Sequence, residues 1–240
     1  MATFKLAKEL GIIETISVQK QLKENINTQY FDYLIVIDFE STCWDVKDVN
    51  KRPPEIIEFS AVLFNIASNK ILKQFQQYVM PTESAKLSDF CTKLTGIHQK
   101  QVDDGVPLGT CLMLFMKWIK EQSNSFALSF PGNVIPSESK KVALVTWSDW
   151  DLKICLKNEC KRKRITKSDL FNAWIDLKAL YMGHYNRKPK GLNGALTELG
   201  MKFIGREHCG LDDAQNTALL AGKMAKDGVL LYITKDLSQT

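Results

Sequence analysis

The sequence predicts an α/β fold in which helices cover both faces of a mixed, five-stranded sheet. Residues 33–38 form an apolar, β-branched run that is typical of a central strand buried on both faces. Two further strand-like segments follow and are joined by turn residues, which indicates an antiparallel hairpin. Beyond them, helical and strand-like segments alternate, as they do where helices connect parallel strands. A hairpin followed by this alternation predicts a mixed sheet.

The expected elements follow from local patterns along the chain. Apolar and β-branched runs bounded by turn residues indicate strands, and apolar residues at helical spacing indicate helices. The segment from 123 to 141 is rich in Ser, Pro and Gly, so we expect a surface insertion there. The predicted strands are 33–38, 56–64, 71–79, 142–146 and 174–180, and the predicted helices are 87–94, 108–121, 151–163, 191–199 and 211–226.

Length and composition bound the class of protein. The chain has 240 residues, which suits one domain, and 45% of them are hydrophobic, which is enough for a sizeable core. Residues 1–28 are polar and rich in Lys, so we predict a flexible N-terminal extension, followed by a single domain over residues 29–240. The net charge of +5 is compatible with a polyanionic partner but does not require one.

Cysteine use and hydropathy indicate a cellular location. None of the six cysteines forms a CxxC pair, so zinc-finger spacing is absent, and we expect core residues or free thiols in a reducing compartment. No apolar run is long enough for a signal peptide or for a membrane span of ~18–20 residues. We therefore expect an intracellular protein, in the cytoplasm, the nucleus or both, that is not secreted and binds no membrane.

Two acids lie at the end of the first predicted strand. Asp38 and Glu40 lie two residues apart, and residues at that spacing in a strand point to the same face. Adjacent carboxylates repel each other unless a proton or a cation lies between them, and hard divalent cations bind through oxygen ligands. The pair is also compatible with two acids that only solvate the end of the strand, because Asp-x-Glu alone is a weak motif.

Two more acidic clusters come later in the chain. Asp149 and Asp151 lie between the fourth strand and a helix, where one acid can stabilise the helix start and the other can bind a metal. The pattern does not say which acid does which. His208 precedes Asp212 and Asp213 at the start of the last helix. A histidine beside a metal site is a natural general base for water, although a lone loop histidine is more often an ordinary surface residue.

The three clusters together are more specific than any one of them. They combine a strand-end acid pair, an acid between a strand and a helix, and a histidine five residues before an acid in the first helical turn. This combination is typical of phosphodiester hydrolysis by two metal ions, which lie about 3.5–4 Å apart and bind the attacking and leaving oxygens. The sequence therefore predicts a hydrolase that uses two divalent cations.

The residues of these clusters resemble those of a known family. Residues 36–43, 94–97, 150–151 and 208–216 are similar to the DEDDh exonucleases, which have a ribonuclease H-like fold. Within that family they resemble the branch of enhanced-RNAi and histone-mRNA 3′-end exonucleases. The resemblance extends from about residue 33 to the C-terminus, which is most of the chain. It implies that residues 29–240 form a single exonuclease domain.

The resemblance also assigns roles to five residues. It implies that Asp38, Glu40, Asp151 and Asp213 are catalytic and bind two Mg²⁺ ions, for which Mn²⁺ can substitute. It implies that His208 is the catalytic general base. The expected reaction is the stepwise release of 5′-nucleotides from the 3′ end of single-stranded RNA.

Three apolar residues near the clusters are candidates for substrate binding. Leu94 and Ile97 belong to a stretch that faces the terminal nucleotide in related exonucleases, so their side chains are expected to enclose its base. Phe39 lies between the first two acids, where an aromatic ring can stack on a base with a gain of about 1–3 kcal/mol. All three residues are equally compatible with positions in the hydrophobic core.

Two basic segments are candidates for phosphate contacts. Arg187, Lys188 and Lys190 belong to a proline-containing loop, and contacts from them would make affinity depend on salt. The segment 161–164 is the weaker candidate, because cations at the end of a helix are also stabilised by the helix dipole.

The sequence leaves the polymer and one other class of function open. No residue distinguishes ribose from deoxyribose, so DNA is an alternative or additional partner to single-stranded RNA, and the chain could be a DNA-directed 3′ exonuclease. A nucleic-acid-binding adaptor that keeps the fold without catalysis is a further alternative. The complete set of four acids and one histidine argues against it. Protein partners cannot be predicted from this pattern.

Overall fold

A mixed sheet forms the centre of the structure. The computed structural model describes residues 29–48, 52–131 and 138–239. Within these ranges the sheet has seven strands, in the order β3-β2-β1-β5-β6-β7 with β4 beside β5. The β1–β5, β5–β6 and β4–β5 pairs are parallel, and the β1–β2, β2–β3 and β6–β7 pairs are antiparallel. The strands are β1 (Tyr33–Ser41), β2 (Ile56–Asn65), β3 (Lys70–Tyr78), β4 (Leu128–Ser129), β5 (Lys140–Thr146), β6 (Ala173–Asp176) and β7 (Lys235–Asp236).

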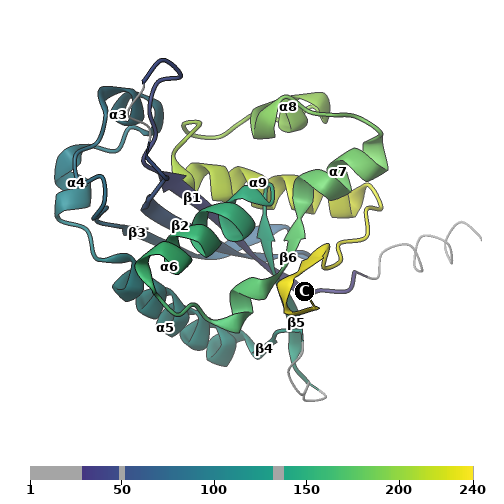
Figure 1. Ribbon diagram of the computed structural model, residues 1–240. Coiled ribbons are helices and arrows are strands. Elements are labelled where there is room, and N and C mark those ends of the chain that lie inside the picture. The colour runs from purple at the N-terminus through teal and green to yellow at the C-terminus, as the bar shows by residue number, and fades with distance from the viewer. Residues whose placement is uncertain (1–28, 49–51, 132–137, 240) are drawn as a thin grey trace, which may run out of the picture.

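Helices cover both faces of this sheet, as the sequence predicts. Figure 1 shows α5 and α9 on opposite faces. The predicted α/β class, the mixed sheet and the hairpin are confirmed, whereas the two-residue strands β4 and β7 were not predicted. The helices are α3 (Asp89–Thr95), α4 (Gln99–Asp103), α5 (Leu108–Phe126), the π-helix η1 (Trp150–Leu156), α6 (Lys157–Lys163), the 3₁₀ helix η2 (Asp169–Asn172), α7 (Leu177–Tyr185), α8 (Gly191–Glu198), α9 (Gly210–Lys226) and the 3₁₀ helix η3 (Leu237–Gln239).

Strand β1 is buried on both faces because its side chains alternate between two hydrophobic clusters. Ile35 and Ile37 pack in the cluster that contains residues of α5, and Leu34 and Val36 pack in the cluster that contains residues of α9. Burying each such side chain fully contributes roughly 1.5–3 kcal/mol. The alternation also determines on which face of the sheet the polar side chains of β1 lie, because its even-numbered residues face α9. Asp38 and Glu40 therefore lie on the α9 face.

The last predicted strand is too long. It ends at Asp176 instead of residue 180, and Leu177 begins helix α7. The Asp176 carboxylate accepts a hydrogen bond from the Ala179 backbone N–H at 2.9 Å, which caps the helix. Leu177, Leu180 and Tyr181 are buried at helical spacing. The apolar run hides this boundary, because a buried strand and a buried helix look alike over a few residues.

The predicted insertion and the predicted helix after β5 are also revised. Within 123–141, the first residues complete α5, residues 128–129 form β4, and β5 begins at Lys140, while 132–137 lie outside the described residues. The helix predicted at 151–163 is divided into η1 and α6. The short helix α4 was not predicted.

Two predictions concern the domain organisation of the chain. The proposed N-terminal extension, 1–28, lies outside the described residues. A single domain over 29–240 stays a prediction. In the part of the chain that the structure describes, every helix is too short or too polar to cross a bilayer.

Candidate active site

A cavity of about 500 Å³ brings together the predicted catalytic residues. It lies beyond the C-terminal end of the β1 core and next to the residues that follow β5. Sites in open α/β sheets are found at such strand ends. Its lining includes Asp38, Phe39, Glu40, Leu94, Trp147, Trp150, Asp151, Lys190, Leu192, Asn193, Glu207, His208 and Asp213.

A second cavity is larger but lacks this chemistry. It measures about 890 Å³ and is lined by residues of α5, β4 and η2, among others. None of the predicted site residues lines it. The grouping of four carboxylates and a histidine, and not size, therefore identifies the smaller cavity as the candidate active site.

Strand β1 supplies the first two acids and is joined to the third. Asp38 is partly exposed, and Glu40 is only 8% exposed. Between them, the Phe39 backbone N–H donates a hydrogen bond of 3.1 Å to Oδ1 of Asp151, which is 6% exposed. This bond fixes the start of η1 against β1, so that three carboxylates come from two adjacent segments.

The structure distinguishes Asp149 from Asp151, whose separate roles the sequence pattern did not assign. Asp151 lies in the π-helix η1 and lines the cavity. Asp149 does not line it and forms ion pairs with Lys153 at 3.4 Å and Lys235 at 3.2 Å. π-Helices are rare and are often found at functional sites. The surroundings of Asp151 therefore fit the role that the family resemblance implies, and those of Asp149 fit a structural one.

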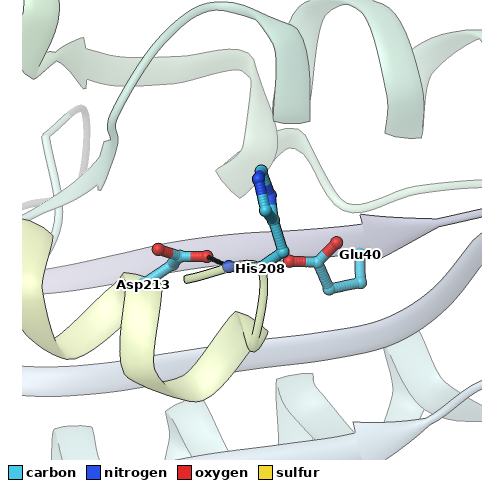
Figure 2. Close-up of side chains that lie close together, drawn as sticks. All are labelled: Glu40, His208 and Asp213. Atoms are coloured by element: carbon cyan, nitrogen blue, oxygen red, sulfur yellow. Dashed lines mark hydrogen bonds between the residues drawn. The ribbon is translucent and has the colours of Figure 1, made fainter. Parts of the chain in front are cut away.

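The loop before α9 supplies His208, and the first turn of α9 supplies Asp213. The His208 backbone N–H donates a 2.8 Å hydrogen bond to Oδ2 of Asp213. His208 has a φ of 62°, a left-handed conformation that costs energy for residues other than glycine and is found at functional sites. Figure 2 shows Glu40 and Asp213 on either side of His208. One ligand atom from each of these three residues lies within 4.8 Å of the others.

Burial and mutual repulsion disfavour the charged forms of the four carboxylates. Burial, followed by the charges of Asp151, Glu40 and Asp213, raises the pKa of Asp38 well above its ordinary value. Burial and nearby carboxylates raise the pKa of Glu40 to about 9. Burial raises the pKa of Asp151 to about 7, although the Phe39 N–H opposes the shift, and raises that of Asp213 to about 7 against the His208 N–H.

The donor set fits hard divalent cations. Four carboxylates provide only oxygen ligands, which Mg²⁺ and Mn²⁺ prefer. A bound cation offsets the repulsion that raises the pKa of each acid, and no Lys or Arg forms an ion pair with any of the four within the described ranges. The residues that line the cavity are thus suited to hold a divalent metal.

Of the three apolar residues that were predicted to contact substrate, Leu94 lines the cavity with a partly exposed side chain. Leu94 is the sixth residue of α3. Ile97 is 3% exposed and packs in a small cluster with Ile57 and Val102, away from the cavity lining. The Phe39 ring packs edge-on against Phe59 in the core, with ring centroids 4.6 Å apart. Burial in the core thus argues against base stacking by Phe39 and against base contact by Ile97.

The basic loop between α7 and α8 reaches the cavity at one residue. Lys190 lines the cavity, whereas Arg187 and Lys188 are exposed and lie outside its lining. In the weaker basic segment, Lys163 forms 2.7 Å ion pairs with the buried carboxylates of Glu55 and Glu159. Lys163 is thus paired within the protein, an interaction that neither interpretation of this segment predicted.

Several residues of the site were missed at the level of sequence. Trp147 and Trp150 line the cavity, and the Trp150 side chain is 39% exposed. Asn193 of α8 donates a 2.6 Å hydrogen bond to Glu207 beside His208. Glu58 lies buried in β2 opposite Glu40. One signal could have revealed Glu58, because it is the only charged residue in the otherwise apolar or small run 56–64.

The fold and the acidic cavity define the class of protein, and comparison with known proteins agrees. The chain belongs to the RNase T exonuclease family, whose pattern it matches over residues 35–221. Within that family it is similar to ERI1 exoribonuclease 2, with 53% identity to the Xenopus laevis protein and 51% to the Homo sapiens protein, each over 100% of this chain. It spans only 36% and 35% of the length of those two relatives.

Two other known proteins match this chain over most of its length and most of their own length. The 3′-5′ exonuclease Snipper of Drosophila melanogaster is 39% identical over 99% of this chain and 96% of that protein. The structure of the nuclease domain of 3′hExo, a DEDDh family member bound to rAMP, superposes with a TM-score of 0.76 and 35% identity, over 86% of this chain and 98% of that one. The DEDDh exonuclease fold predicted from the resemblance is therefore confirmed.

Proposed function

We propose that this chain is a metal-dependent 3′–5′ exoribonuclease that shortens single-stranded RNA and releases 5′-nucleotides. The observation that carries the proposal is the convergence of Asp38, Glu40, Asp151, Asp213 and His208 on one cavity of about 500 Å³. The names of the relatives support the direction and the polymer, since they are called exoribonucleases or 3′-5′ exonucleases.

The four acids would hold two divalent cations, Mg²⁺ in the first place with Mn²⁺ as a substitute. Asp38 and Glu40 would bind from β1, Asp151 from η1 and Asp213 from α9. When bound, the cations supply positive charge that binds the scissile phosphate and favours the ionised form of the attacking water. The chain contributes a fixed arrangement of carboxylates, held in part by the bonds from the Phe39 and His208 backbone N–H groups.

His208 would act as the general base. Its imidazole accepts a proton from water, the water oxygen forms a bond to phosphorus, and the bond from phosphorus to the 3′-oxygen breaks. The leaving 3′-oxygen takes up a proton from solvent, so the shortened strand ends in a 3′-hydroxyl and the released nucleotide keeps its 5′-phosphate. The exposed position of His208 allows its proton to exchange with solvent after each cycle.

The cavity walls would hold the terminal nucleotide. Leu94 and Trp150 present partly exposed apolar surface, and such surface binds bases without sequence preference. A volume of about 500 Å³ lies in the range of small-ligand sites, which suits a single nucleotide. Lys190 would contact a phosphate, and Arg187 and Lys188 would extend this contact along the strand.

The cellular setting is a further part of the proposal. All six cysteines are unpaired, and four of them are buried. Thiols persist in reducing compartments. We infer that the protein acts inside the cell, in the cytoplasm, the nucleus or both.

A gel time course tests the function. Single strands labelled at the 5′ end, in RNA and DNA versions with free or blocked 3′ ends, are incubated with Mg²⁺ or with EDTA. We expect a ladder that shrinks from the free 3′ end of RNA and disappears with EDTA and with Asp38→Ala. Equal loss of DNA would widen the substrate class to both polymers. RNA that is bound but never shortened would contradict the proposal and favour a nucleic-acid-binding adaptor.

A further inference from the structure

Glu58 is a buried carboxylate behind the candidate active site. It is 1% exposed in β2, between Ile57 and Phe59, which are both fully buried. No lysine, arginine or histidine among the described residues forms an ion pair with it. A buried charge without an opposite charge nearby is costly. A cation bound at the neighbouring site would therefore stabilise a charged Glu58 side chain.

Three hydrogen-bond donors hold the Glu58 carboxylate in place. Its Oε1 accepts from the Ser60 hydroxyl at 2.9 Å and from the Gln76 amide at 2.8 Å. Its Oε2 accepts from the Gly210 backbone N–H at 3.2 Å. Ser60 and Gln76 belong to β2 and β3, and Gly210 begins α9, so these three donors hold the Glu58 carboxylate between three elements.

The position of Glu58 links two parts of the site. It pairs with Glu40 across the β1–β2 ladder, beside the cation-binding acids. Through Gly210 it contacts the first residue of α9, two residues after His208 and three before Asp213. A Cβ added at Gly210 would lie 3.2 Å from the Glu58 carboxyl carbon, so glycine allows this close approach.

Its charge acts on the acids in front of it. After burial, Glu58 is one of the carboxylates that raise the pKa of Asp38, Glu40 and Asp213. The same negative charge that disfavours ionised acids in an empty site attracts a cation into it. Glu58 does not line the cavity. Its carboxylate therefore lies behind the cation-binding acids, where it can strengthen cation binding without being a ligand.

We propose that Glu58 is a positioning residue that strengthens divalent-cation binding through its buried charge and fixes the start of α9 through Gly210. The proposal rests on the proposed function, because it concerns the same cation site. Residues behind metal ligands typically change metal affinity by about 10- to 100-fold when they are substituted. Glu58 would act in this way on Glu40 and Asp213.

Cation binding without nucleic acid is the direct test. The full chain is titrated with Mn²⁺, and free Mn²⁺ is measured by electron paramagnetic resonance. We expect Glu58→Gln to weaken Mn²⁺ binding by at least about tenfold. Glu58→Asp keeps the charge and should retain most of the affinity. Glu159→Gln is the matched control, since Glu159 is equally buried but pairs with Lys163 at 2.7 Å, and its loss should leave Mn²⁺ affinity unchanged.

Thermal stability separates this role from a merely structural one. In EDTA, Glu58→Gln should melt no lower than the wild type, because it removes a repulsive charge, and Mn²⁺ should raise its Tm less than that of the wild type. A lower Tm in EDTA with Mn²⁺ affinity within about twofold of the wild type would overturn the inference. A wild type that binds no Mn²⁺, or binds it equally well as Asp38→Ala, would overturn the proposed function as well.

Discussion

Asp149 and Asp151 are identical side chains two residues apart, yet their surroundings differ. Asp151 is buried in the cavity beside β1, and Asp149 is paired with two lysines outside it. We expect Asp151→Asn to lower kcat on single-stranded RNA by at least about a hundredfold, because metal-bound charge stabilisation is worth several kcal/mol. Asp149→Asn should stay close to the wild type. Equal losses in both variants would contradict the assignment.

His208 lies close enough to Glu40 and Asp213 to be either a general base or a metal ligand. As a base, it contributes a rate factor of about 10²–10⁴, so His208→Ala should lower kcat by that amount. The same variant should bind Mn²⁺ as tightly as the wild type in a titration without RNA. Weaker Mn²⁺ binding would assign His208 to the metal instead.

At the scale of elements, the loop before α9 joins two walls of the cavity. The Arg206 guanidinium donates to the Lys93 and Leu94 carbonyls at 2.9 and 3.0 Å, where α3 ends. Its neighbour Glu207 accepts a 2.6 Å hydrogen bond from Asn193 in α8. Because His208 follows directly, one short loop connects His208 to α3 on one side and to α8 on the other.

Loss of the link to α3 should weaken substrate binding. Arg206→Ala removes two charge-assisted bonds on the surface, worth about 1 kcal/mol together, so we expect KM for RNA to rise roughly three- to tenfold. If Arg206 acts through Leu94, then Arg206→Ala should add little to KM in a Leu94→Ala background. Lys202→Ala, an exposed cation four residues earlier, controls for the lost charge. Additive effects of Arg206 and Leu94 would contradict the link.

At the scale of the whole molecule, the acidic cavity should make stability depend on pH and on cations. The pKa rises from an ordinary 3.8 to about 7 in Asp151 and Asp213, and from 4.5 to about 9 in Glu40. Folding therefore takes up protons, and the stability that this provides is fully present below about pH 4 and is lost as pH rises through about 7 and then 9.

In EDTA, Tm should accordingly fall between about pH 5 and pH 9, and Mg²⁺ should reduce the fall because it replaces the missing protons. Scanning fluorimetry across this range checks the sign. Glu40→Gln removes the carboxyl group whose pKa is raised to about 9, so this variant should show a shallower decline of Tm with pH. A Tm that rises with pH in EDTA would show that the acids are not crowded as the structure has them.

The architecture and the acids could be predicted because they depend on short-range patterns. The apolar run of β1 predicts a central strand, and the two-residue spacing of Asp38 and Glu40 predicts a shared face. The features that the sequence did not determine depend on tertiary contacts. Ile97 looks the same in sequence whether it packs against Ile57 or faces a base, and the strand end at Asp176 depends on its cap to Ala179. The contacts that distinguish Asp151 from Asp149, a hydrogen bond from Phe39 and the long-range ion pair of Asp149, are likewise tertiary.

We propose that four carboxylates from β1, η1 and α9 hold two divalent cations. A crystal structure with Mn²⁺ and a 5′-mononucleotide, measured at the manganese absorption edge, tests it most directly. We predict two anomalous peaks about 3.5–4 Å apart among Asp38, Glu40, Asp151 and Asp213. An anomalous map without peaks among these carboxylates, or with the peaks at Asp149, would contradict the account.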